Sequence, residues 1–335
     1  MSVRDPLLRI DNVYVSYETN RGLFTRKPPF VAVSDVSFSI EAGETFGLVG
    51  ESGSGKTSIG RAVLRLVPIA DGEVRFGGTD IGGFGKTTPL SYRQAVQMIF
   101  QDPQSSLNPR HTVAKILGQV ITRHRNILGK QQRQAVEELL DTVQLASYIA
   151  DRHPSELSGG QRQRVAIAHA LATEPSLIVC DEAVSALDVS TQSQILNLLQ
   201  DLQARLGLSY LFISHDLAVV RHVSSRIAVM YQGRLVEIGT TENIYRTPRH
   251  PYTQMLLASV PVPDPLGSQE RREKRVALQS NLNTSDLSQS TSNGCAFQSR
   301  CPIAEDICHR DAPSLTNISD QHLIACHAIN DGSTS

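Results

Sequence analysis

The chain has 335 residues, of which 40% are hydrophobic and 19% are charged, and its formal net charge is −1. Length and composition indicate a soluble globular protein of one large or two modest domains. The near-neutral charge argues against nucleic acid as a partner, and no apolar stretch approaches the about 20 residues of a membrane helix. We therefore expect a cytosolic protein that meets a membrane only through partner subunits.

The N-terminal part predicts several strands around one glycine-rich loop. Alternating or continuous apolar residues bounded by turn residues indicate the strands. A helical pattern of apolar residues follows the loop directly. The expected strands span 7–17, 31–40, 44–49, 72–77 and 96–100, and the expected helix spans 58–66.

The loop between strand 44–49 and the helix has the form G-x-x-x-x-G-K-[ST]. Its glycines let successive backbone N–H groups converge on phosphate oxygens, and the dipole of the following helix adds to the attraction. Lys56 can reach the β- and γ-phosphates, and the Thr57 hydroxyl can ligate Mg²⁺. The sequence therefore predicts that this chain binds a nucleoside triphosphate. The loop is Gly50, Glu51, Ser52, Gly53, Ser54, Gly55, Lys56 and Thr57, with Ser58 behind it.

Helical periodicity dominates residues 107–158, which we expect to form an inserted helical part. Ser158 is a suitable helix N-cap for the long helix that follows. Beyond it, strands and helices alternate, which indicates an α/β core with a parallel sheet. The expected later elements are a strand at 177–180, a helix after Asp188 that stops at Gly207, a strand at 208–213 and a hairpin at 227–238 turning at Gln232-Gly233.

Two acidic residues and one histidine follow buried strands. Asp181, at the tip of its strand, is placed to hold the Mg²⁺ shell. Glu182 beside it is the candidate general base, because a carboxylate there can polarise the attacking water. A solvated turn or a helix cap is the ordinary alternative for such a pair. His215 alone is a weak signal, although the ends of parallel strands are where α/β sites gather.

Six motifs, in order and spacing, make the chain resemble the ATPase subunits of ABC transporters over residues 7 to about 260. The subgroup resemblance is to oligopeptide/dipeptide importers, of the dipeptide-type F subunit. It rests on residues 101–110 (QDPQSSLNPR), on 249–257 (RHPYTQMLL) and on the cysteine-rich tail. The six motifs are 50–57, Gln101, Leu157–Gln161, Leu177–Glu182, Ser185–Asp188 and His215.

The resemblance implies a P-loop NTPase core with an antiparallel β subdomain and an inserted helical subdomain at about 107–160. The expected domains are an ATPase domain at 1–260, a linker at 261–294 and a small cysteine-rich tail domain at 295–330. Proline, charged and Ser/Asn/Thr-rich stretches in the linker are consistent with this division.

The resemblance also assigns roles to single residues. Gln101 would touch Mg²⁺ and report its presence to the membrane partner, and His215 would contact the γ-phosphate and orient Glu182. Tyr17 would stack on adenine, although an aromatic residue on an early strand is as often part of the core. The signature motif would close over the ATP of a second subunit, with Asp188 near the seam. This motif comprises Leu157, Ser158, Gly159, Gly160 and Gln161.

The function that the resemblance implies is ATP hydrolysis coupled to import of peptides or similar small solutes. The expected partners are a second homologous ATPase subunit, two integral-membrane permease subunits and, indirectly, an extracytoplasmic solute-binding protein. The location would be the cytoplasmic face of the inner membrane. A soluble ABC-type ATPase not linked to transport is the alternative, and a non-hydrolysing ATP-binding module or an exporter are further ones.

Four of the five cysteines lie in the last forty-one residues, namely Cys295, Cys301, Cys308 and Cys326. A reducing compartment disfavours disulfides, and the spacing lacks the close pairs that zinc sites prefer. Four thiolates at this looser spacing can hold a 4Fe-4S cluster, which the subgroup resemblance also implies. Zinc or no metal remain alternatives. Cys180, inside a predicted buried strand, is expected to be a small core residue.

Overall fold

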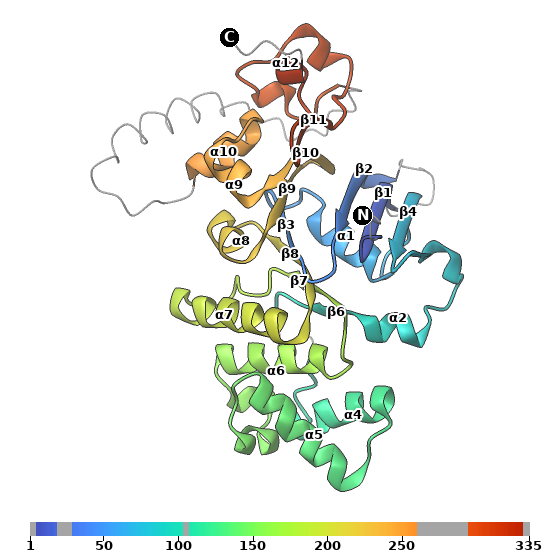
Figure 1. The fold of residues 1–335 in the computed structure, drawn as a ribbon, viewed down its shortest axis with the longest axis vertical. Coiled ribbons are helices and arrows are strands. Elements are labelled where there is room, and N and C mark those ends of the chain that lie inside the picture. Colours follow the sequence, from blue (N-terminus) through green and yellow to red (C-terminus); the bar gives the residue numbers. More distant parts are fainter. Residues whose placement is uncertain (1–4, 19–28, 103–106, 260–293, 331–335) are drawn as a thin grey trace, which may run out of the picture.

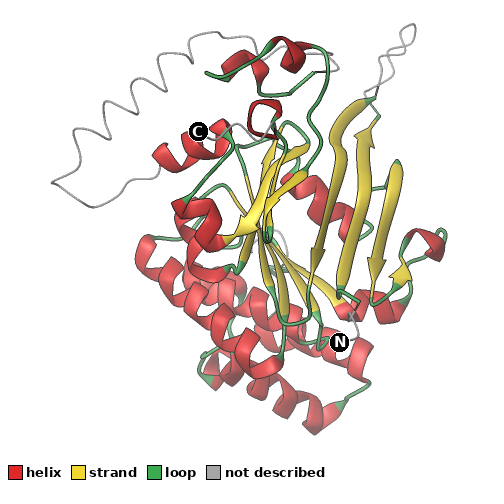
Figure 2. Cartoon of the chain, turned by 45° about the horizontal axis from the view of Figure 1, so that its top comes forward, coloured by secondary structure: helices red, strands yellow, loops and turns green. Residues whose placement is uncertain are grey.

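The computed structural model describes residues 5–18, 29–102, 107–259 and 294–330. Two sheets form its framework (Figures 1 and 2). The expected linker at 261–294 lies outside the described residues except for Gly294. The strands are β1 Leu8–Tyr17, β2 Phe30–Ile40, β3 Thr45–Val49, β4 Asp71–Phe76, β5 Thr79–Asp80, β6 Val96–Ile99, β7 Leu177–Asp181, β8 Ser209–Ser214, β9 Arg226–Tyr231, β10 Arg234–Thr240, β11 Thr316–Ser319 and β12 His322–Ile324.

The α-helices in the described ranges are α1 Lys56–Val63, α2 Leu90–Ala95, α4 Val113–Arg125, α5 Gly129–Thr142, α6 Gly159–Leu171, α7 Val189–Leu206, α8 Leu217–Val223, α9 Thr241–Arg246, α10 Pro251–Ser259 and α12 His327–Asn330. Short 3₁₀ helices are η1 Gly82–Phe84, η2 Ser147–Asp151, η3 Pro154–Glu156, η4 Gln298–Arg300 and η5 Asp306–His309.

The central sheet has eight strands in the order β11-β12-β10-β9-β3-β8-β7-β6. Strands β6, β7, β8 and β3 run parallel, so their carboxyl ends meet at one edge. Every residue of β3, β7 and β8 is buried, because helices or the second sheet cover both faces. Asp181 is the last residue of β7, and the phosphate-binding loop, Glu182 and His215 directly follow the carboxyl ends of β3, β7 and β8.

The second sheet is antiparallel, with the order β2-β1-β4-β5. Helix α1 packs between it and one face of the central sheet through Ile59, Ala62 and Val63. Helices α4 to α7 belong to a separate apolar core on the opposite face. Figure 1 shows α4, α5 and α6 extending away from the central sheet, below α7 in that view.

The C-terminal residues join the central sheet. Strand β12 pairs antiparallel with β10, and β11 pairs with β12. The buried carboxylate of Glu237, on β10, fixes this junction. Its Oε1 lies 2.7 Å from His322 Nε2 of β12, and its two oxygens accept hydrogen bonds from the backbone N–H groups of Arg249 (2.8 Å) and His250 (3.0 Å). A buried charge of this kind needs such partners, so the junction depends on all of them.

The predicted α/β class is confirmed, and each predicted strand and helix of residues 7–238 has a counterpart within a few residues. The elements without a sequence prediction are short or lie near the C-terminus. They include β5 and α2, whose apolar patterns are too short to recognise. They also include β11, whose exposed positions alternate with half-buried ones, and β12, which has only three residues.

Candidate functional site

The phosphate-binding loop needs glycine at two close backbone approaches. Gly50 has φ +156°, and a Cβ there would lie 2.1 Å from the Met230 carbonyl oxygen. Gly55 has φ +103°, and a Cβ there would lie 2.4 Å from the Ala32 carbonyl oxygen. Both distances are far below van der Waals contact, so a side chain at either position would displace the loop from β2 and β9.

Lys56 begins α1 and lies buried within the loop. Its Nζ donates to the carbonyl oxygens of Gly50 and Glu51, both at 2.8 Å, and to Ser54 Oγ at 3.2 Å. Burial lowers the pKa of Lys56, while the carboxylates of Glu182, Asp181 and Glu51 raise it. The ammonium group therefore lies at the centre of the loop, near several acidic side chains.

Thr57 and Asp181 meet across the parallel strands. Thr57 Oγ1 donates to Asp181 Oδ1 at 2.9 Å. Burial raises the pKa of Asp181, and the hydrogen bond from Thr57 lowers it. A hydroxyl and a carboxylate are oxygen ligands of the kind that Mg²⁺ prefers. This donor pair therefore fits the predicted magnesium site.

The Glu182 side chain, at the end of β7, contacts residues at the ends of the two neighbouring strands. Its Oε2 accepts a hydrogen bond from Gln101 Nε2 at 2.9 Å, and His215 Nδ1 lies 3.1 Å from its Oε1. Glu182 also has φ +50°, in the left-handed region that non-glycine residues seldom adopt. Its N–H donates to the Ile213 carbonyl at 2.9 Å, which holds the backbone in this conformation. Strain of this kind is concentrated at functional sites.

Tyr17 lies at the end of β1, where its hydroxyl is 3.0 Å from Ser58 Oγ in the first turn of α1. Its ring also packs partly against the apolar core of the second sheet. The structure thus places Tyr17 beside the phosphate-binding loop, and its predicted stacking on adenine stays a prediction.

The signature motif forms a second cluster. Ser158 caps α6 and forms a capping box with Gln161: Ser158 Oγ accepts from Gln161 N at 3.3 Å, and Ser158 N donates to Gln161 Oε1 at 3.0 Å. A Cβ on Gly160 would lie 2.6 Å from Thr191 Cγ2, so this glycine lets α6 approach the start of α7. The buried Leu157 precedes this turn, and Gly159 lies beside Leu187.

Asp188 belongs to the same second cluster and caps α7. Its carboxylate accepts hydrogen bonds from Thr191 N at 3.0 Å, Thr191 Oγ1 at 2.8 Å and Ser190 Oγ at 2.6 Å. These bonds lower the pKa of Asp188 well below its usual range. Figure 1 shows α6 and α1 well apart, so one chain carries two separate groups of site residues.

The four tail cysteines are free thiols. Burial raises the pKa of Cys326 to about 11 and raises the pKa of Cys295 and Cys301. In the part of the chain that the structure describes, no group of three or more His, Cys, Asp or Glu side chains is arranged to hold a metal ion. The predicted iron–sulfur site is therefore not supported by the described residues, and Cys295 and Cys301 pack against the apolar core.

Two contacts to the loop had no sequence prediction. Glu51 N donates to the Tyr252 hydroxyl at 3.0 Å, and Arg300 pairs with the Glu51 carboxylate at 3.1 Å. Tyr252 lies in the segment that supported the subgroup resemblance, which was the available signal. Arg300 is 249 residues away from Glu51 in the chain, and nothing in the local sequence pairs them.

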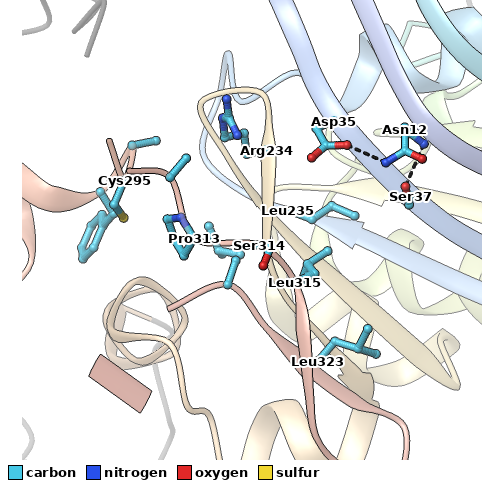
Figure 3. Close-up of a pocket in the computed structure, with 15 residues that line it drawn as sticks. Asn12, Asp35, Ser37, Arg234, Leu235, Cys295, Pro313, Ser314, Leu315 and Leu323 are labelled. Carbon is cyan, nitrogen blue, oxygen red and sulfur yellow. Dashed lines mark hydrogen bonds between the residues drawn. The ribbon is translucent and has the colours of Figure 1, made fainter. Parts of the chain in front are cut away.

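A cavity of ≈ 300 Å³ lies where the C-terminal residues meet β10 and the second sheet (Figure 3). Arg234 and Leu235 line it from β10, and Asn12 and Asp35, joined by a 2.8 Å hydrogen bond, line it from β1 and β2. Its remaining walls are mainly apolar residues of the tail. None of the predicted nucleotide-binding residues lines this cavity, whereas Cys295 does.

Comparison with known proteins decides the family. The ABC transporter family model matches residues 33–185, and the model of the oligopeptide/dipeptide transporter C-terminal region matches residues 236–308. The oligopeptide transport ATP-binding protein AppF of Bacillus subtilis is 44% identical, over 97% of this chain and 98% of its own. The chain belongs to the ABC transporter ATP-binding proteins.

Other relatives agree with this assignment. The "Probable peptide ABC transporter ATP-binding protein y4tS" of Sinorhizobium fredii is 45% identical, over 96% of this chain and 90% of its own. The ATP-binding cassette MJ0796, solved as a dimer bound to ADP and Pi, matches with a TM-score of 0.61 and 27% identity, over 70% of this chain and 98% of its own. A cbiO1 structure from Clostridium perfringens, with a TM-score of 0.63 and 22% identity over 84% of this chain and 96% of its own, shares the fold.

As a member of this family, the chain is an ATPase that couples ATP hydrolysis to transmembrane transport. None of the helices in the described ranges has the length and hydrophobicity of a membrane span.

Proposed function

We propose that the chain is the ATP-hydrolysing subunit of an importer for peptides. The observation that carries the proposal is the Glu182 carboxylate, held by Gln101 and His215 at the strand ends beside Lys56. This places a carboxylate next to the loop that would hold the phosphates. The names of the relatives AppF and y4tS, as oligopeptide and peptide transporter proteins, support the substrate class.

The proposed chemistry follows from the positions of these side chains. Lys56 and the loop N–H groups bind the β- and γ-phosphates, and the Thr57 hydroxyl and Asp181 face the cation site beside them. Mg²⁺, when bound there, neutralises charge on the phosphate oxygens. Glu182 accepts a proton from the attacking water or orients it, and His215 holds the carboxylate in place for this role.

The separation of the two residue groups supports a dimer in which each ATP lies between two subunits. The loop of one subunit would bind the phosphates, and the N-terminus of α6 in the other would cover them with its N–H groups. Bound ATP would then favour the closed pair and hydrolysis would open it. MJ0796, which was solved as a dimer, supports the pairing of two subunits.

The remaining partners follow from the family and the subgroup. We propose that the ATPase dimer, homo- or heteromeric, works beneath two permease subunits at the cytoplasmic face of the inner membrane. An extracytoplasmic binding protein would deliver the peptide to the permease subunits.

The isolated chain is expected to be a poor ATPase, because each site needs residues from a second subunit. Turnover per chain should rise with chain concentration, and again when permease and partner subunits are added. Steady-state phosphate release over a range of chain concentrations, with and without the reconstituted complex, measures this. A rate that is independent of concentration and equal to that of the complex would contradict the shared sites.

The tail cysteines require a separate measurement. From the resemblance to dipeptide importers, we propose that the four tail cysteines hold a 4Fe-4S cluster in solution. We expect the chain purified without oxygen to contain it. Iron, sulfide and zinc per chain should be measured beside the number of free thiols. Stoichiometric iron and sulfide, lost in Cys301→Ser and kept in Cys180→Ser, would establish the cluster. Four free thiols, or stoichiometric zinc, would end this prediction.

A further inference from the structure

The cysteine-rich tail contacts the phosphate-binding loop through one arginine. Arg300, at the end of η4, directs its guanidinium group at the side chain of Glu51. Its Nη1 lies 3.2 Å from Glu51 Oε2, and its Nη2 lies 3.1 Å from Glu51 Oε1. The two guanidinium nitrogens thus contact both carboxylate oxygens in a bidentate geometry, which the single ammonium group of lysine cannot reproduce.

Aromatic side chains fix the position of this arginine. The guanidinium carbon of Arg300 lies 5.6 Å from the ring centres of both Tyr231 and Phe297, and its Nη1 donates to the Tyr231 hydroxyl at 3.3 Å. Phe297 is 2% exposed and packs against Tyr231, Tyr252 and His250. Only 23% of the Arg300 side chain is exposed. The Arg300 guanidinium group therefore lies over two aromatic rings, which hold it beside the phosphate-binding loop.

The same loop residue has a second anchor. The backbone N–H of Glu51 donates to the hydroxyl of Tyr252, on α10. The start of α10 is held by Glu237, which also binds His322 of the tail. Both the backbone and the side chain of Glu51 are thus fixed by elements that meet at the docked tail.

We propose that Arg300 is a positioning residue for ATP binding, which acts by holding the Glu51 side chain and neutralising its charge. Without the arginine, the Glu51 carboxylate would be free to turn toward the bound phosphates and repel them. The loop would also lose one of its anchors, so more ordering would be required when ATP binds. The docked tail would in this way set the affinity of the nucleotide site. The inference rests on the proposed role of residues 50–57.

The test is a double-mutant cycle on the full-length chain, with the affinity for the non-hydrolysable analogue adenylyl imidodiphosphate, in the presence of Mg²⁺, measured by calorimetry. Arg300→Gln is expected to weaken binding by about fivefold, the low end of measured coupling between sites, because the pair is partly exposed. In a Glu51→Gln background the same change should have no effect, since the charge it neutralises is already gone. Arg300→Lys should fall between wild type and Arg300→Gln.

Arg310→Gln is the matched control, since Arg310 lies exposed in the same tail, and it should bind as wild type does. An unchanged affinity in Arg300→Gln would overturn the proposal. An equal loss with and without Glu51 would also overturn it, because it would indicate damage to the tail rather than a lost pair. Lys56→Ala in parallel separates the two proposals: wild-type affinity there would refute the binding role of the loop itself.

Discussion

Glu182→Gln is expected to leave ATP binding intact and to reduce turnover in the assembled complex by about 100- to 10,000-fold, the range typical of general acid–base groups. The substitution keeps the shape of the side chain and an oxygen that can accept the hydrogen bond from Gln101. It removes the negative charge that would polarise water. Steady-state phosphate release measures turnover, and equilibrium titration with ATP measures binding.

Asp201→Asn is a matched control for this prediction. Asp201 lies on the exposed side of α7, so the same loss of a carboxylate there should leave both binding and turnover unchanged. Wild-type turnover in Glu182→Gln would remove Glu182 from the catalytic role. A loss of ATP binding equal to the loss of turnover would instead assign it to nucleotide binding.

The sequence alone was enough to predict the site residues whose positions depend on local structure. Asp181 and Glu182 end a run of apolar residues that is buried on both faces, and His215 follows the next strand of the same sheet. Parallel strands bring such ends together whatever the length of chain between them. The loop is likewise defined within eight residues, and its glycines have the backbone angles that the motif requires.

Contacts between distant segments could not be predicted in the same way. Arg300 reaches Glu51 because β12 pairs with β10 and brings the tail over the phosphate-binding loop. That pairing involves two residue pairs on short strands, too few for a recognisable pattern. The resemblance places Asp188 near the subunit seam. In the structure its carboxylate accepts hydrogen bonds from Thr191 and caps α7. Capping and a position at the seam are compatible, and the role at the seam stays a prediction.

Lys56→Ala is expected to weaken ATP binding by about 100-fold or more, because it removes two or more charge-assisted hydrogen bonds at a buried position. In the structure the ammonium group donates to two loop carbonyls and to Ser54. We expect it to exchange these partners for phosphate oxygens when ATP binds. Without it, the carboxylates of Asp181 and Glu182 would repel the triphosphate more strongly.

The control for Lys56→Ala is Lys86→Ala, since Lys86 is an exposed lysine outside the loop. It should bind ATP with wild-type affinity. Thermal unfolding of both variants without nucleotide separates a damaged loop from a lost ligand contact, because only the former lowers the melting temperature in the absence of ATP. If Lys56→Ala binds ATP as tightly as Lys86→Ala, the phosphates lie elsewhere and the assignment of residues 50–57 to nucleotide binding is wrong. If it binds weakly while its unfolding is unchanged, the loss measures the contact of the ammonium group with the phosphates.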